Sequence, residues 1–190
     1  AELSLPQISI FVAAFYIGAM VFQFPVGWLS DRMDRRILIV ATSAIGFIAA
    51  VFAIFGENIF IILLGSAFFI GGMSNPLYSL LIAYTNDFLE PDDMASASGG
   101  LLFLNGLGAI SGPLFTGYLM TEIGPTGFFV ILAALLGLLT VYGFYRMTQR
   151  GISDVDTSSY ATVLPTTSVV AVEIAQEVAI EAAEELDEST

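Results

Sequence analysis

Five apolar stretches dominate this sequence, and each is long enough to cross a membrane as a helix. About 20 helical residues span a hydrocarbon core of ~30 Å, and a helix satisfies its own backbone hydrogen bonds in lipid. None of the five has the polar face that a helix in a soluble protein presents to water. The sequence therefore predicts an all-α integral membrane protein with spans at about 5–28, 37–55, 59–88, 95–120 and 127–145.

The composition agrees with this class and excludes several functions. Only 12% of the 190 residues are charged, whereas soluble domains have about 25%. The chain has no cysteine and no histidine, which removes thiol catalysis, histidine proton relays and histidine-based metal sites. We therefore predict no cofactor, no metal and no enzymatic activity. With five basic residues against 18 acids, we also predict no binding to nucleic acid.

Charge divides the chain into two segments. Residues 1–150 hold nine acids and five arginines, whereas residues 151–190 hold nine acids and no base. We predict that the first segment is a transmembrane helical bundle. The second is predicted to be an acidic cytoplasmic tail that is mostly disordered, with a weak amphipathic helix at 169–186.

The arginines predict the orientation. Arg32, Arg35 and Arg36 lie in the first connection, and Arg146 and Arg150 follow the fifth span. Basic residues favour the cytoplasmic side, and five spans place these two clusters on the same side. The N-terminus then faces outward and the C-terminus lies in the cytoplasm. The odd number of spans predicts that at least one more precedes residue 1.

The first connection also carries a spaced pattern, Gly27-x-Leu29-x-Asp31-Arg32-x-x-Arg35-Arg36. This pattern resembles motif A of the major facilitator superfamily, which joins the second and third helices of each six-helix half. The resemblance implies that the glycine allows close helix approach and that the first acid faces a helix N-terminus in the opposite half. Asp34 departs from the pattern, because glycine is usual there. The predicted cytoplasmic gate consists of Gly27, Asp31, Arg32, Arg35, Arg36 and Asp87.

Two later segments are similar to the second half of a bacterial subgroup of this family, whose substrates are mostly unassigned. They are 75–87 and 108–117, read as Asn-Pro-Leu-Tyr…Asn-Asp and Gly-x-x-x-Gly-Pro-x-x-x-Gly. The resemblance implies part of a six-helix bundle, helices eight to twelve of a twelve-helix transporter in the bacterial inner membrane. The missing first half would then be a partner. The alternative, helices two to six, is weaker because residues 59–70 lack the charge that first halves often carry.

Two further sets of residues are candidates for function. Small residues and a proline allow close packing and favour a kink in the fourth span: Gly108, Gly112, Pro113 and Gly117. Neutral polar side chains inside the spans either bond a neighbouring helix or line a substrate cavity: Asn75, Tyr78, Gln23, Asn105 and Tyr84. The middle of the bundle has no charged residue, so a coupling carboxylate would lie elsewhere.

Together these features predict the C-terminal part of a secondary active transporter that moves a small organic molecule by alternating access. Its partners would be that substrate, the lipid bilayer and the first half of the same transporter. The alternative is a non-transporting membrane scaffold or assembly subunit with five spans.

Overall fold

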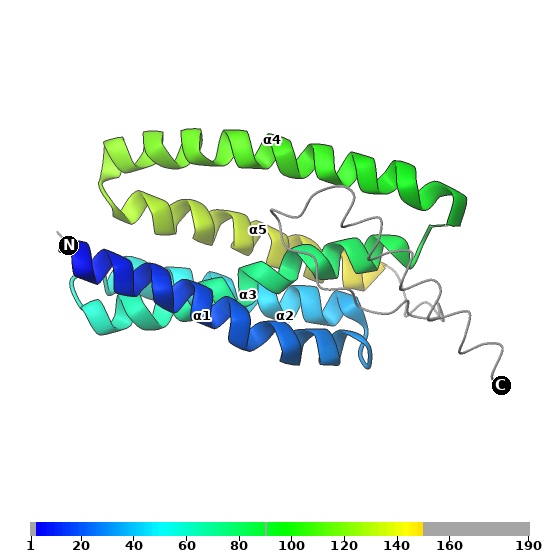
Figure 1. The fold of residues 1–190 in the computed structure, drawn as a ribbon, viewed down its shortest axis with the longest axis horizontal. Helices are drawn as coiled ribbons and strands as arrows, with labels where there is room; N and C mark the ends of the chain where they lie inside the picture. The colour runs from blue at the N-terminus through cyan, green and yellow to red at the C-terminus, as the bar shows by residue number, and fades with distance from the viewer. Residues whose placement is uncertain (1–2, 90, 150–190) are drawn as a thin grey trace.

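The computed structural model describes residues 3–89 and 91–149, and the secondary-structure elements of this part of the chain are all α-helices. Five helices run back and forth with short connections, so that neighbours in sequence are antiparallel (Figure 1). Each is long and apolar enough to cross a membrane. The prediction of an all-α membrane protein with five transmembrane helices is therefore confirmed. The helices are α1 (Leu5–Ser30), α2 (Arg35–Phe55), α3 (Phe60–Asn86), α4 (Pro91–Ile123) and α5 (Thr126–Gln149).

Several helices extend beyond the spans expected from hydropathy. The largest difference is in α4, which starts at Pro91 and ends at Ile123, whereas the apolar stretch covers about 95–120. Proline is well tolerated in the first turn of a helix, where its missing N–H has no intrahelical partner to lose. Helical hydrogen bonding therefore continues into residues too polar for the hydrocarbon. The predicted tail, 151–190, lies outside the described residues.

The closest packing joins α1 and α3. Gly18 is buried on α1, and a Cβ at this position would overlap the backbone carbonyl of Phe68. On the facing helix, a Cβ at Gly71 would overlap the carbonyl of Phe15. Glycine at both positions lets the two backbones meet directly, which is how helices associate tightly in lipid.

The core lies where α2 packs between α3 and α5. One cluster joins Ala50 and Ala53 of α2 to Leu63 of α3 and to Phe129 and Ala133 of α5. A second cluster, nearer the arginine-rich end, joins buried side chains of α1, α2, α3 and α5: Val26, Leu38, Ile39, Leu77, Leu80 and Leu136. These four helices therefore form a continuous bundle.

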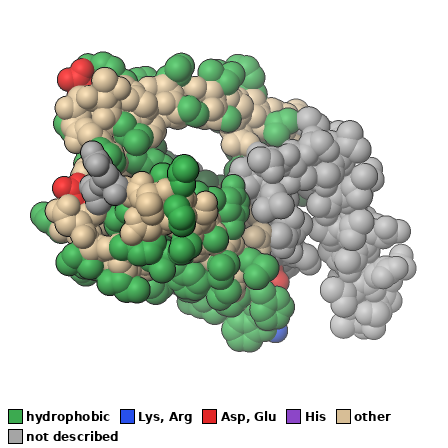
Figure 2. All heavy atoms as spheres, turned by 60° about the vertical axis from the view of Figure 1, so that its left-hand side comes forward, with side chains coloured by type: hydrophobic (Ala, Val, Ile, Leu, Met, Phe, Trp, Pro, Cys, Tyr) green, Lys and Arg blue, Asp and Glu red, His purple; other side chains and the backbone are tan. Residues whose placement is uncertain are grey.

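Helix α4 lies apart from this bundle. It contacts α5 and, over a short stretch, α3, where Leu101 packs against Ile82. None of the most apolar window of α4 is buried. Figure 2 shows an opening between the uppermost helix and the helices below it. A methyl group added at Gly112, or at any other glycine of α4, would meet no neighbouring atom of the described residues within 4 Å.

Large hydrophobic side chains cover much of the outer surface (Figure 2). Examples are Phe24 on α1, Phe55 on α2 and Leu138 on α5, which are 78%, 86% and 68% exposed. A soluble monomer rarely exposes contiguous apolar patches of this extent. Several hydroxyl groups inside the helices bond to the backbone of the same helix; for example, Thr42 donates to the carbonyl of Leu38 at 2.8 Å. Both features suit a bundle surrounded by lipid.

Candidate functional site

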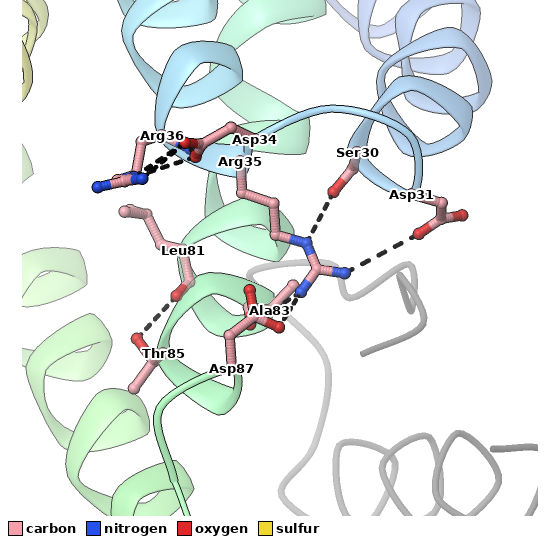
Figure 3. Close-up of polar contacts among 9 residues, drawn as sticks. All are labelled: Ser30, Asp31, Asp34, Arg35, Arg36, Leu81, Ala83, Thr85 and Asp87. Carbon is pink, nitrogen blue, oxygen red and sulfur yellow. Dashed lines mark hydrogen bonds and ion pairs between the residues drawn. The ribbon is translucent and has the colours of Figure 1, made fainter. Parts of the chain in front are cut away.

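The candidate site is the connection between α1 and α2 with the facing end of α3 (Figure 3). Helix α1 ends at Ser30, Asp31 forms its C-cap, and α2 starts at Arg35. Gly27 is buried in the last turn of α1, and its carbonyl accepts a hydrogen bond from the Asp31 backbone N–H at 3.3 Å. The last helical residue of α3 is Asn86, and Asp87 is its C-cap.

Arg35 is the centre of this site. Its side chain is only 1% exposed, yet it contacts the ends of two other helices. Its Nε donates to Ser30 Oγ at 3.1 Å, and its Nη1 donates to the carbonyl of Ala83 at 3.2 Å. The same Nη1 forms a short ion pair with Asp87, whose side chain is 8% exposed. Buried charges are tolerated when they are paired and hydrogen-bonded in this way.

Helix geometry explains why a cation is stable at this point. The C-termini of α1 and α3 lie side by side here, and each carries partial negative charge on its last carbonyl groups. Arg35 belongs to the start of α2, but its guanidinium reaches Ser30 and Ala83 at the two C-terminal ends. One side chain therefore connects three helices.

Asp31 lies at the edge of the same cluster. Its Oδ1 is 3.9 Å from Arg35 Nη2, and its side chain is 44% exposed. Asp31 is thus much more accessible than Asp87, the other carboxylate that faces Arg35. The two acids differ in how easily each could exchange its partner.

Asp34 stabilises the start of α2. Its side chain accepts from the backbone N–H of Arg36 at 2.9 Å, which is an N-cap contact, and the Arg36 guanidinium binds the same carboxylate at 2.8–3.1 Å. Burial raises the pKa of Asp34, but the hydrogen bonds and charge of Arg36 outweigh it and hold the pKa below its usual value. Because the φ of Asp34 is −56°, this position does not require the glycine that is usual in the family pattern.

The remaining arginine of the connection faces outward. Arg32 is exposed, donates to the carbonyl of Trp28 at 3.1 Å, and places its guanidinium 4.2 Å from the centre of the Trp28 ring. Of the three arginines in this connection, it is therefore Arg35 that the fold joins to Asp87.

The predicted cavity residues are distributed over three helices. Gln23 lies on α1, three of them lie on α3, and Asn105 lies on α4. The Nε2 of Gln23 is buried without a hydrogen-bond partner among the described residues. Tyr78 packs near Leu101 of α4, whereas Tyr84 lies close to the arginine-rich end, where its ring centre is 5.1 Å from that of Phe88. Asn75 is half-buried beside Pro76.

Sequence reasoning missed two features of this region. The first is the pair formed by Asp34 and Arg36; an acid shortly before the span predicted at 37–55 is an N-cap signal and could have indicated it. The second is a pocket between α2, α3 and α5, lined by Arg36 and Arg146. No sequence pattern could have revealed the pocket, because its walls come from helices that lie far apart in the sequence.

The described fold and site define a multi-pass helical membrane protein with a charged cluster at one end of the bundle. The family model of the Major Facilitator Superfamily matches residues 2–171. The chain therefore belongs to the Major Facilitator Superfamily.

Two curated relatives are similar to this chain. An uncharacterized MFS-type transporter, YfkF of Bacillus subtilis, is 34% identical over 141 residues, which cover 70% of this chain and 34% of the relative. The benzoate transport protein of Acinetobacter baylyi is 29% identical over 148 residues, which cover 75% of this chain and 31% of the relative. The chain thus spans about a third of the length of these relatives. No solved structure matches it.

Proposed function

We propose that this chain is part of a secondary active transporter, and not an enzyme, that moves a small organic molecule by alternating access. The 31–36 connection, with Asp87, acts as its cytoplasmic gate and corresponds to motif A of the family. The observation that carries this proposal is the buried Arg35, which connects the ends of three helices through Ser30, Ala83 and Asp87. Such a node keeps α1, α2 and α3 together while they move as one body.

In this mechanism Asp31 is the group that changes partners. It is half exposed and lies 3.9 Å from Arg35, so leaving that contact costs less desolvation than breaking a buried pair. The N-terminal end of a helix outside this chain offers it partial positive charge. Asp31 contacts that helix in one state of the cycle and is released from it in the other.

The partner surface is α4 together with the exposed face of α1. A Cβ added at Gly108, Gly112 or Gly117 of α4 would meet no atom of the described residues within 4 Å, although small residues in membrane helices usually serve close helix packing. We propose that the other helices of a longer transporter pack there and that this chain supplies helices eight to twelve. Pro113 would give α4 a bend for the rocking motion. If the chain were a five-span scaffold, no further helix would pack against these glycines.

The substrate site would lie between the two halves, with Asn75, Tyr78, Gln23, Asn105 and Tyr84 as candidate contacts. The similarity to a protein named for benzoate transport makes small aromatic carboxylates the first compounds to test. We place the protein in the bacterial inner membrane, with its arginine-rich end and its C-terminus in the cytoplasm.

The test compares Asp31→Asn with Asp93→Asn. Both substitutions remove one exposed carboxylate at the arginine-rich end, but only the first touches the proposed gate. Since this chain has no cysteine, Ser111→Cys on α4 supplies its one reporter for impermeant maleimide, in a longer transporter whose other cysteines are replaced by serine. The probes are labelling from each side of the membrane and uptake of radiolabelled benzoate.

The gate proposal expects Asp31→Asn to change the ratio of inside to outside labelling severalfold, with Asp93→Asn close to the parent protein. Equal labelling and equal uptake in the two variants would refute the gate. Labelling that does not depend on side in any variant would count against alternating access itself.

A further inference from the structure

A pocket of about 240 Å³ opens between α2, α3 and α5 at the arginine-rich end of the bundle. Its polar rim includes Arg36, Tyr142 and Arg146, and its apolar wall includes Leu81 and Leu139. The pocket is separate from the Arg35 cluster and from the predicted substrate contacts other than Tyr84. Its lining shares Arg36 with the 31–36 connection and Tyr84 with the candidate substrate contacts, but the binding argued here is distinct from both the gate and the substrate site.

Arg146 supplies the uncompensated charge of this pocket. It lies in the last turn of α5, is exposed, and donates a long hydrogen bond of 3.4 Å to the hydroxyl of Tyr142. Among the described residues it forms no ion pair with a carboxylate. Arg36, by contrast, forms an ion pair with Asp34, in which Arg36 Nη2 lies 2.8 Å from Asp34 Oδ2. The rim therefore has a net positive charge and donors that can turn toward an anion.

The lining of the pocket changes from charged to apolar along α5. Arg146 and Leu139 are seven residues apart on α5, a separation of roughly 10 Å along the helix axis. Leu139 and Leu81 are half-buried where α5 and α3 both contact α2. The pocket thus has a charged end level with the helix termini and an apolar end that continues into the spanning region.

The size of the pocket favours a ligand that fills it only in part. Pockets that enclose drug-sized molecules usually have volumes of about 300–1,000 Å³, and this one is smaller and open to its surroundings. A phospholipid meets this condition, because its headgroup and part of one acyl chain can enter while the rest stays in the bilayer. Basic pockets between helices at the membrane surface are suited to anionic headgroups.

We propose that this pocket binds an anionic phospholipid. Its phosphate contacts Arg146 with help from the Tyr142 hydroxyl, and one acyl chain lies against Leu139 and Leu81. The proposal does not depend on transport, because the residues that line the pocket lie on α2, α3 and α5 and its ligand is not the transported substrate.

The experiment uses native mass spectrometry of the purified protein, with phosphatidylglycerol, phosphatidylcholine or inorganic phosphate added. Arg146→Gln removes the proposed phosphate contact. Arg32→Gln is the matched control, because Arg32 is an exposed arginine at the same end that lies over Trp28, away from the pocket. Thermal unfolding in lipid-free detergent checks that both variants are folded.

We expect retained phosphatidylglycerol and little phosphatidylcholine. Arg146→Gln should weaken phosphatidylglycerol binding roughly fivefold, which corresponds to the ~1 kcal/mol of one basic residue near an anionic surface. Arg32→Gln should bind like the parent protein. Equal losses of phosphatidylglycerol binding in Arg146→Gln and Arg32→Gln would mean that general surface charge attracts the lipid. Inorganic phosphate bound as well as phosphatidylglycerol would mean that the pocket is a site for free anions. Either result overturns the proposal.

The acidic segment of this chain, residues 151–190, is the competing occupant of the pocket. A variant with Glu173, Glu177 and Glu181 changed to glutamine separates the two. If that variant and Arg146→Gln lower the lipid-free unfolding temperature equally, and lipid restores neither, the segment occupies the pocket and the lipid proposal fails. An unchanged unfolding temperature in the glutamine variant supports the lipid.

Discussion

Arg35 and Asp87, which are 52 residues apart in the sequence, form a buried ion pair that joins the start of α2 to the end of α3. The guanidinium also binds Ser30 and the carbonyl of Ala83. Their side chains are 1% and 8% exposed, so neither charge is well solvated. Removing one partner would leave the other buried and unpaired, and this is the costly way to break such a pair.

We therefore predict that Arg35→Ala lowers the free energy of unfolding by about 3 kcal/mol. Reversible unfolding in mixed micelles, followed by circular dichroism, measures this change. Arg32→Ala is the control, and an exposed cation–π contact of this kind is worth only about 0.5–1 kcal/mol. Similar losses in the two variants would contradict the central role of Arg35.

A second prediction separates glycines that pack from glycines that do not. Gly18→Ala places a methyl group on the carbonyl of Phe68 and should cost at least about 1–3 kcal/mol, because α1 and α3 must move apart. Gly112→Ala meets open space in the described helices and should leave stability unchanged or raise it by about 0.5–1 kcal/mol.

The same denaturation assay measures both variants. If Gly112→Ala destabilised the chain as much as Gly18→Ala, α4 would have to pack against this chain in a way that the structure does not contain. Neutral stability of this chain alone, combined with altered maleimide labelling in the longer transporter, would instead agree with a partner helix on α4.

The membrane spans could be predicted from the sequence because hydropathy over about 20 residues is a local property. The position of the charged connection between α1 and α2 could be predicted for the same reason. Which arginine becomes buried could not be predicted from the sequence, since Arg35 and Arg36 are adjacent and chemically identical. Arg35 points toward the ends of α1 and α3, whereas Arg36 binds Asp34; this difference depends on where α3 ends in space.

The glycines of α4 illustrate a second limit. Their spacing predicts close packing but does not name the partner, and in the described residues the space beside Gly108 and Gly112 is empty. By contrast, no sequence pattern distinguished Gly18 and Gly71, although they form the tightest helix contact among the described residues. The spacing of small residues is informative only once the facing helix is known.

A third prediction concerns Asp34 and pH. Its pKa is lowered from 3.8 in the folded state, so its ionised form stabilises the fold above pH 3.8, and this contribution is lost as the pH falls through the lower folded value. Asp34→Asn keeps an N-cap side chain but loses the charge, whereas Asp34→Ala loses both and should cost about 0.5–2 kcal/mol at neutral pH.

Unfolding measured between pH 3 and pH 7 tests this assignment. The difference in stability between the parent protein and Asp34→Asn should be constant near neutrality and shrink below about pH 4. A difference that grew with acidity would mean that the carboxylate is stabilised in its protonated form, contrary to the bonds from Arg36.

The final prediction concerns the opposite end of the bundle, where Glu57 accepts a hydrogen bond from the hydroxyl of Thr126. Thr126 is the first residue of α5, so the carboxylate also lies near the positive end of that helix. Glu57→Gln should lower the free energy of unfolding by about 0.3–1 kcal/mol, because it loses the charge at the helix N-terminus. Glu122→Gln, an exposed carboxylate at the same end, should have a smaller effect. High salt should reduce the Glu57 effect as the charge is screened; an effect that persists undiminished at about 1 M salt would assign the contribution to the hydrogen bond alone.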